Sequence, residues 1–225
     1  MLVVIIILFV AFLLLFYASY SISAGVYMKS LCRNKAAKDL IAITFDDGVD
    51  PILTPKVLDV LKRYDAKATF FIIGKQALHH AEILKRIVAE GHSIGNHSYS
   101  HIWDLPFKSS QSIYNDISMC TAVLKQSADI DVTLFRPPFG VTNPMIAKAV
   151  KKSGLISIGW SIRSFDTMGQ DLDIVKHRVT KQVDGGKVIL LHDNRENADL
   201  LLESILVEIK KRGLRAVTIN KLFNL

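Results

Sequence analysis

The first 18 residues of the chain are hydrophobic without interruption, and Lys29 carries the first ionised side chain after them. A helix that crosses the core of a bilayer needs roughly 20 apolar residues, whereas the apolar part of a cleavable signal peptide has about 7–15. The length therefore predicts that residues 1–23 form a transmembrane anchor that is not cleaved. The alternative is cleavage within the small residues from Ser19 to Gly25.

Short runs rich in β-branched and aromatic residues follow the anchor, and they alternate with longer segments of helical period. This order is typical of βαβ units around a parallel sheet. The predicted strands are 40–44, 68–72, 93–96, 133–136, 155–160, 187–191 and 215–218, and the predicted helices are 52–64, 77–90, 111–126, 144–153, 172–183 and 198–212. Seven strands and six helices indicate an α/β barrel, formed by a single domain at 38–225 with residues 24–37 as a connector.

Residues that start and stop helices support these boundaries. Asp50 before Pro51 predicts a helix start, with the carboxylate as the cap and the proline in the first turn. Gly91, Gly154 and Gly213 each follow a predicted helix. A left-handed backbone at such a glycine closes the helix before the next strand begins.

Composition and charge narrow the function. The chain has 225 residues, half of them apolar, which suffices for one core but not for two full domains. Its net charge of +7 comes from scattered Lys and Arg, so we predict a solvated surface and no nucleic-acid binding. Cys32 and Cys120 form no metal motif, and either they pair outside the cytoplasm or they are free thiols.

Charges beside the anchor give a conflicting signal about its orientation. No Lys or Arg precedes the hydrophobic run, although anchors and signals usually begin with one. Lys29, Arg33, Lys35 and Lys38 follow it closely. Positive charges tend to remain on the cytoplasmic side, so this pattern by itself favours a cytoplasmic domain.

Polar side chains with catalytic chemistry follow most of the predicted strands. In parallel α/β folds the carboxyl ends of the strands meet at one edge, where the functional site lies. The residues at these ends are Asp46 and Asp47, His97 to His101, Arg136 to Gly140, Asp166, and His192 with Asp193. We therefore expect them to converge.

A metal site is predicted from part of this set. His97 and His101 are four residues apart, so on a helical turn both rings could face one cation. Such a pair alone is more often ordinary surface or core histidine. Adjacent Asp46 and Asp47 at the end of a buried strand are costly without a cation or hydrogen-bond donors. One aspartate and two histidines suit Zn²⁺ or a similar divalent ion, with Co²⁺, Ni²⁺ and Mn²⁺ as alternatives.

Hydrolysis at such a centre also needs a base and an acid. The aspartate that does not bind the metal could be the base, and His192 could be the acid. Arg136 would keep the base ionised, and Asp166 would favour the imidazolium form of His192. Taken alone, His192 could equally be a capping or core histidine.

These motifs resemble those of the polysaccharide deacetylase family, the NodB homology domain of carbohydrate esterase family 4. The resemblance covers the chain from about Leu40 onward. The motifs are T-F-D-D-G at 44–48, H-S-x-x-H at 97–101, R-P-P-F-G at 136–140 and L-x-H at 190–192. The resemblance implies a distorted (β/α)7 barrel, here preceded by an N-terminal hydrophobic helix.

The resemblance also implies a role for each matching residue. By this resemblance, the metal ligands would be Asp47, His97 and His101, the catalytic base would be Asp46, and the general acid would be His192. Arg136 would orient the base, and Asp166 would pair with the acid. The Phe139 amide would be the oxyanion donor, and Leu190 would line the acetate pocket. The family's D-x-x-D-W motif is altered, because Arg163 and Thr167 replace its first aspartate and its tryptophan. Trp160 is a further candidate for contact with a sugar ring, or else a core residue.

The implied function is metal-dependent removal of acetyl groups from a carbohydrate polymer. N-acetylglucosamine-type units of peptidoglycan or a chitin-like chain are the expected substrate. Alternatives are an O-acetyl esterase on xylan-like or lipid-linked glycans, a hydrolase of small non-sugar amides, and a catalytically silent glycan-binding barrel. The expected partners are the acetylated polysaccharide and the membrane, with the catalytic domain on the extracytoplasmic side of the envelope.

Overall fold

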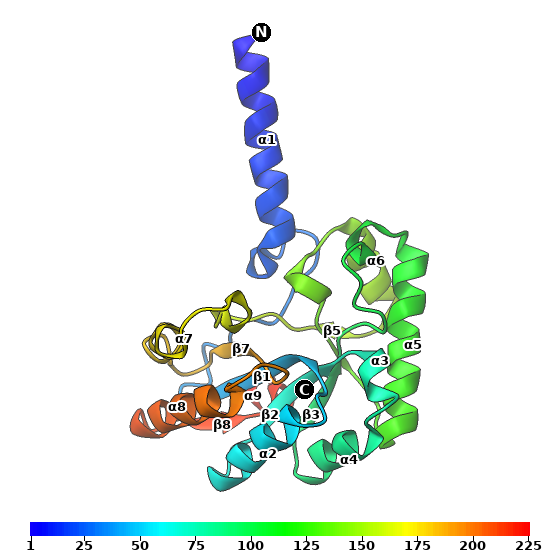
Figure 1. Ribbon diagram of the computed structural model, residues 1–225. Helices are drawn as coiled ribbons and strands as arrows, with labels where there is room; N and C mark the ends of the chain where they lie inside the picture. Colours follow the sequence, from blue (N-terminus) through cyan, green and yellow to red (C-terminus); the bar gives the residue numbers. More distant parts are fainter.

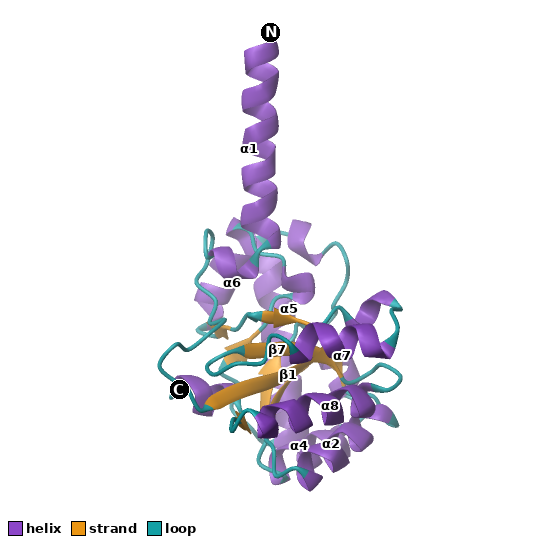
Figure 2. Cartoon of the chain, turned by 90° about the vertical axis from the view of Figure 1, so that its left-hand side faces the viewer, coloured by secondary structure: helices purple, strands orange, loops and turns teal.

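The computed structural model describes residues 1–225. One long helix, α1, projects from a domain in which helices surround a curled parallel sheet (Figures 1 and 2). The strands are β1 (Leu40–Gly48), β2 (Ala68–Ile72), β3 (Ser93–Asn96), β4 (Leu134–Phe135), β5 (Ile156–Ser157), β6 (Ile162–Arg163), β7 (Val188–His192) and β8 (Arg215–Val217). The α-helices are α1 (Leu2–Tyr20), α2 (Leu53–Arg63), α3 (Gly74–Ala77), α4 (Ala81–Ala89), α5 (Ser110–Ala128), α6 (Pro144–Ser153), α7 (Leu172–Thr180), α8 (Ala198–Lys211) and α9 (Ile219–Phe223).

The strand order is β5-β4-β3-β2-β1-β7-β6, every pairing is parallel, and β8 pairs with β1 beside this path. The edge strands β5 and β6 do not pair with each other, so the sheet curls without closing. The predicted distorted barrel is therefore confirmed. The segment after α1 lies across the open side, where Leu31 bridges to Ile158 and Arg33 bridges to Lys187.

Two short strands replace the single strand predicted at 155–160. The chain leaves β5 after Ser157, crosses the open side through Trp160, and resumes pairing in β6 against β7. The prediction missed β6, α3 and α9 because each has only two to five residues. A periodic pattern cannot be recognised over so short a length.

Strand β1 shows how alternation directs chemistry to one face of the sheet. Successive strand residues point to opposite faces. Ile41, Ile43 and Phe45 belong to the large core cluster between the sheet and the surrounding helices. Thr44 and Asp46 alternate with them and therefore face the inside of the curl. The apolar half of β1 stabilises the strand by about 1.5–3 kcal/mol for each large buried side chain, and this holds the polar half in place.

The glycines predicted to end helices have the expected backbone, whereas the predicted start at Asp50 and Pro51 is only partly confirmed. The Asp50 carboxylate accepts hydrogen bonds from the amides of Ile52 and Leu53, although α2 begins only at Leu53 and Pro51 precedes it. Gly91, Gly154 and Gly213 all have left-handed backbones, with φ of 79°, 71° and 70°. Cys32 and Cys120 are free.

Helix α1 is apolar on every side and is exposed along nearly its whole length. Its 19 residues span about 28 Å at 1.5 Å per residue. By length and composition it could cross a membrane or serve as a signal sequence. Its base is attached to the domain, because Ala18 and Ile22 are buried.

Candidate active site

At the end of β1, two adjacent carboxylates both face His97 but have different nearest partners. Asp46 continues the strand and lies opposite His192 of β7 in the sheet register. Asp47 has a left-handed backbone with φ of 67°, which turns its side chain away from that of Asp46. Asp46 Oδ1 lies 2.6 Å from Arg136 Nη1. Asp47 Oδ1 lies 3.2 Å from His101 Nε2 instead.

Arg136 is completely buried and has a partner for each of its nitrogens. It donates to Asp46, to the Thr44 hydroxyl, and to the carbonyls of Ile158 and Gly159. Its guanidinium also lies 4.1 Å from the centroid of the Phe71 ring. Burial lowers the pKa of Arg136, and the Asp46 carboxylate opposes that shift. Removing one partner of such a buried pair destabilises a protein by about 3–5 kcal/mol, because the other charge is left buried without a partner. Arg136 and Asp46 therefore hold each other in place.

The two motif histidines lie on a loop rather than on the predicted helical turn. Ser98 and His101 have positive φ angles, and the loop folds back so that the His97 and His101 rings lie 4.9 Å apart. Asp116 of α5 accepts hydrogen bonds from the amides of Tyr99 and Ser100. The proximity of the rings was correctly predicted, but the loop produces it.

Asp47, His97 and His101 form a group that fits a divalent metal ion. Their candidate ligand atoms all lie within 4.8 Å of one another. Asp47 Oδ1 is 3.4 Å from His97 Nε2 and 3.2 Å from His101 Nε2. Tetrahedral ligands with bonds of about 2.0–2.1 Å are separated by roughly 3.3 Å. His101 Nε2 is buried and makes no hydrogen bond, as expected of an atom that binds a cation.

Hydrogen bonds and charge prepare these ligands. His97 Nδ1 lies 2.8 Å from the Arg136 carbonyl, which assigns the proton to Nδ1 and leaves the Nε2 lone pair directed at Asp47. Burial alone would lower the pKa of His97, but Asp46 and Asp47 outweigh it and raise the pKa. Burial and the neighbouring His97 lower the pKa of His101 to about 4. Burial would raise the pKa of Asp47, yet the facing imidazoles hold it well below its usual range.

His192 and Asp166 form the second predicted pair. His192 Nδ1 lies 2.8 Å from Asp166 Oδ1, and the His192 amide donates to Asp166 Oδ2. The Ser164 hydroxyl also donates to Asp166. Burial alone would lower the pKa of His192, but the hydrogen bond and charge of Asp166 raise it. The imidazolium form is therefore favoured, and Nε2 faces the metal group at 3.9 Å from Asp47 Oδ2.

One pocket of about 230 Å³ collects these side chains. Its lining residues are Asp46, Asp47, His97, His101, Phe139, Gly140, Trp160, Arg163, Phe165, Thr167, Leu190, His192 and Arg195. The Phe139 ring lies 4.7 Å from that of His101. A Cβ at Gly140 would come within 2.2 Å of the Trp160 ring, so only glycine allows this wall to form. Arg136 and Asp166 lie behind the pocket and hold residues that line it.

The sequence of this site matches a known family. Residues 33–158 match the family model described as Polysaccharide deacetylase. The chain belongs to the polysaccharide deacetylase family. This family is metal-dependent, and Asp47, His97 and His101 are where this chain could hold the ion.

Two relatives and one solved structure illustrate the similarity. The "Peptidoglycan-N-acetylglucosamine deacetylase" of Bacillus cereus is 37% identical over 188 residues, which cover 81% of this chain and 87% of that protein. The "Peptidoglycan-N-acetylglucosamine deacetylase PgdA" of Listeria monocytogenes serotype 1/2a is 35% identical, and the match spans only 38% of its length. The structure of "peptidoglycan deacetylase PdaC from Bacillus subtilis" superposes with a TM-score of 0.78 at 29% identity, covering 85% of this chain and 93% of that one.

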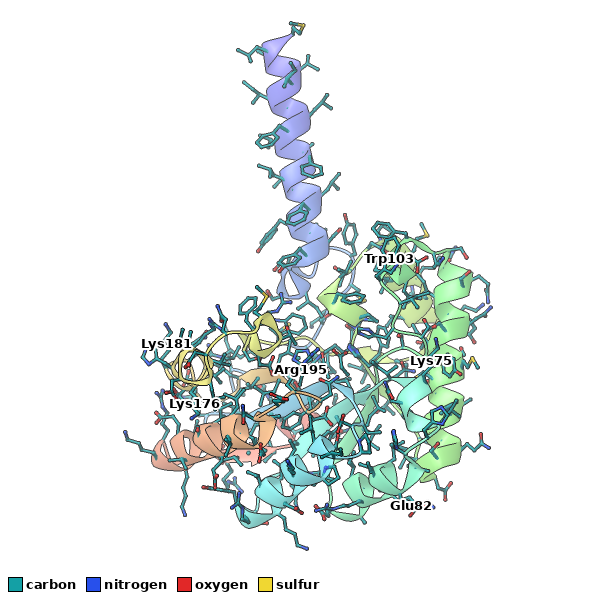
Figure 3. The ribbon with its side chains drawn as sticks, viewed as in Figure 1. Lys75, Glu82, Trp103, Lys176, Lys181 and Arg195 are labelled. Carbon is teal, nitrogen blue, oxygen red and sulfur yellow. The ribbon has the colours of Figure 1, made fainter.

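The sequence analysis assigned no role to several residues at or near this site. Phe165 and Arg195 line the pocket, and Arg195 lies at the centre of the view in Figure 3. Asp116 orders the histidine loop from α5, far along the chain. Burial raises the pKa of Asp193 to about 7, and Thr54 donates to it. Asp193 directly follows the L-x-H motif, and the sequence placed it at this strand end without giving it a role.

Proposed function

We propose that this polysaccharide deacetylase hydrolyses N-acetyl groups on N-acetylglucosamine-type units of a glycan polymer, with peptidoglycan as the leading substrate. The observation that carries the proposal is the convergence of three pairs or groups at one pocket. These are the Asp46–Arg136 pair, the Asp47–His97–His101 group and the His192–Asp166 pair. The names of the Bacillus cereus and Bacillus subtilis relatives support the choice of polymer.

We propose Zn²⁺ as the ion, with Co²⁺, Ni²⁺ and Mn²⁺ as the alternatives that the same ligands accept. One carboxylate and two neutral imidazoles form a donor set that suits zinc and leaves positions open for substrate. When bound, the ion would polarise the acetyl carbonyl and make water a better nucleophile.

Asp46 would act as the general base. Arg136 donates to its Oδ1 at 2.6 Å, which orients the carboxylate and leaves Oδ2 to accept a proton from the attacking water. The backbone amide of Phe139 would stabilise negative charge that develops on the acetyl oxygen. Leu190, which is buried at the pocket wall, would contact the acetyl methyl group.

His192 would act as the general acid. Asp166 holds its Nδ1 proton and favours the imidazolium form, so Nε2–H can protonate the departing sugar nitrogen. Trp160 lines the pocket and could stack against a sugar ring. A silent glycan-binding barrel would not need these residues to be paired and aimed at one pocket.

The segment 1–23 would anchor the enzyme in the membrane, residues 24–37 would connect it, and residues 38–225 would form the catalytic domain. Peptidoglycan lies outside the cytoplasmic membrane, so the proposed substrate places the domain on the extracytoplasmic side. This conflicts with the basic residues after the anchor. Protease protection of the domain in intact cells would contradict the assignment.

The test is a substrate panel with the purified full chain in detergent. Chelation should abolish acetate release from chito-oligomers and peptidoglycan, and Zn²⁺ or an alternative ion should restore it. Acetate from acetylxylan alone would identify an O-acetyl esterase instead. Ring opening of small cyclic amides alone would identify a non-sugar amidase, and inactivity with every ion would favour the silent barrel.

A further inference from the structure

Two aromatic side chains project from a rigid loop beside the base of α1. Trp103 and Phe107 are 78% and 82% exposed, more than any other large hydrophobic residue after α1. Between them, Leu105 and Pro106 are buried. Asn143 donates a hydrogen bond of 2.6 Å to the Pro106 carbonyl. The middle of the loop is therefore packed against the domain. The folded loop itself presents the two rings to the outside.

These rings share a groove with α1. The groove has a volume of about 520 Å³ and lies between the last turns of α1 and the loop. Its lining residues are Phe12, Leu15, Phe16, Ser19, Tyr20, Trp103, Pro106, Phe107, Phe139, Val141 and Asn143, none of which is charged. Figure 3 shows Trp103 on the side of the domain from which α1 projects, whereas Glu82 lies at the opposite end.

Hydrogen bonds fix the direction in which α1 leaves the domain. Thr142 donates from its amide to the Ser19 carbonyl at 2.9 Å and from its hydroxyl to the Ala18 carbonyl at 3.2 Å. Arg163 donates to the Tyr20 hydroxyl. With Ile22 buried beneath, the helix has a defined orientation relative to Trp103 and Phe107.

We propose that Trp103 and Phe107 form a second membrane contact, which we call the aromatic face, inserted into the interfacial zone of the bilayer that α1 spans. Tryptophan concentrates at this zone, and the Phe107 ring adds apolar surface beside it. Lipid is the occupant that fits, because Phe12, Leu15 and Phe16 line the same groove and would themselves be in the hydrocarbon. A groove that is uncharged and mostly apolar fits lipid better than it fits a charged partner.

The position of the catalytic pocket gives this contact a consequence. Phe139 lines both the groove and the catalytic pocket, and Arg163 connects the pocket to Tyr20 at the end of α1. The aromatic face would therefore hold the pocket at the bilayer surface. Given the proposed deacetylase function, the enzyme would favour acetylated sugars carried on the membrane, as in a lipid-linked glycan, over the same sugars in solution.

Fluorescence quenching tests the contact independently of activity. The chain has two tryptophans, so Trp160→Phe leaves only Trp103 as the emitter and Trp103→Phe leaves only Trp160. The full chain is placed in phosphatidylcholine–phosphatidylglycerol vesicles that contain lipids brominated at known depths. We expect shallow bromines to quench Trp103 strongly and Trp160 much less. Equal and weak quenching of both tryptophans would overturn the proposal. Shielding of Trp103 only at high protein density would also overturn it, because a second copy of the chain would then be covering the ring.

Activity tests the consequence. The double variant Trp103→Asp with Phe107→Asp is compared with a control, Leu200→Asp with Val207→Asp, on exposed positions of α8. We expect the first to lose about tenfold in turnover of an N-acetylglucosaminyl lipid in vesicles through misorientation, with turnover of a soluble chito-oligomer unchanged. Equal retention of both activities would contradict the inference. If the unaltered enzyme turns over neither substrate, the proposed function fails while the quenching result still decides the membrane contact.

Discussion

The two ends of the parallel sheet carry the same residue types in opposite settings. At the amino end, Asp39 pairs with Arg215 at 2.7 Å in solvent, and the buried His92 packs against Phe70. At the carboxyl end, Asp46 pairs with Arg136 at 2.6 Å, and both are buried. There His97 faces two carboxylates and has a raised pKa, whereas burial lowers the pKa of His92 to about 4.

This difference shows that residue type alone does not make a site. An aspartate–arginine pair in solvent contributes about 0–1 kcal/mol, and its geometry serves no other group. The buried pair aims a carboxylate into a pocket. The histidine at the amino end is neutral and its Nδ1 accepts a hydrogen bond from the Ala68 amide, whereas the one at the carboxyl end presents a lone pair to a cation site.

The largest expected effect is a difference in activity between variants of the two aspartates, Asp46 and Asp39. Asp46→Asn keeps the shape of the side chain but removes the base, so acetate release from chito-oligomers should fall by about 10²–10⁴-fold. Asp39→Asn should leave it unchanged. Circular dichroism and zinc binding are measured on both variants to show that the fold and the ligands persist. Comparable activity in the two variants would mean that the carboxyl end is not the catalytic edge.

A smaller effect separates the histidines by metal affinity. His101→Gln removes one of the three candidate ligands, and we expect zinc affinity to fall by at least about 100-fold. His92→Gln alters a buried histidine that lies 3.9 Å from the Glu90 carboxylate but belongs to no group of three metal ligands, so this variant should bind zinc as the unaltered chain does. Calorimetric titration of the metal-free protein measures both constants. Equal affinities would remove His101 from the metal site.

Sequence motifs predicted the convergence at the carboxyl edge because the candidate site residues lie at the ends of strands or shortly after them. Alternation along β1 and the register of the parallel strands then bring Asp46 opposite His192. The loop geometry at His97 to His101 was wrong in the sequence prediction, since positive φ at Ser98 and anchoring by the distant Asp116 leave no local pattern.

The aromatic face could not be predicted for a different physical reason. Trp103 and Phe107 lie in an irregular loop without periodicity, and their meaning depends on α1, about 80 residues earlier, standing beside them. Similarly, Arg195 and Phe165 enter the pocket only because the open side of the curled sheet places their loops there. Residues that follow no sequence pattern are brought together only by the tertiary structure.

The smallest effect concerns the amino end and is seen in stability. Because the pKa of His92 is about 4 in the folded chain and about 6.5 when unfolded, the unfolded state binds a proton more readily between these values. His92 therefore contributes fully above pH 6.5, and this contribution is lost as the pH falls toward 4, by at most about 3 kcal/mol. In His92→Gln, the free energy of unfolding from denaturant titrations should decline less over this range than in the unaltered chain, with both measured metal-free. Parallel curves would show that His92 is not held neutral, and the contrast between the two ends of β3 would then rest on the metal ligands alone.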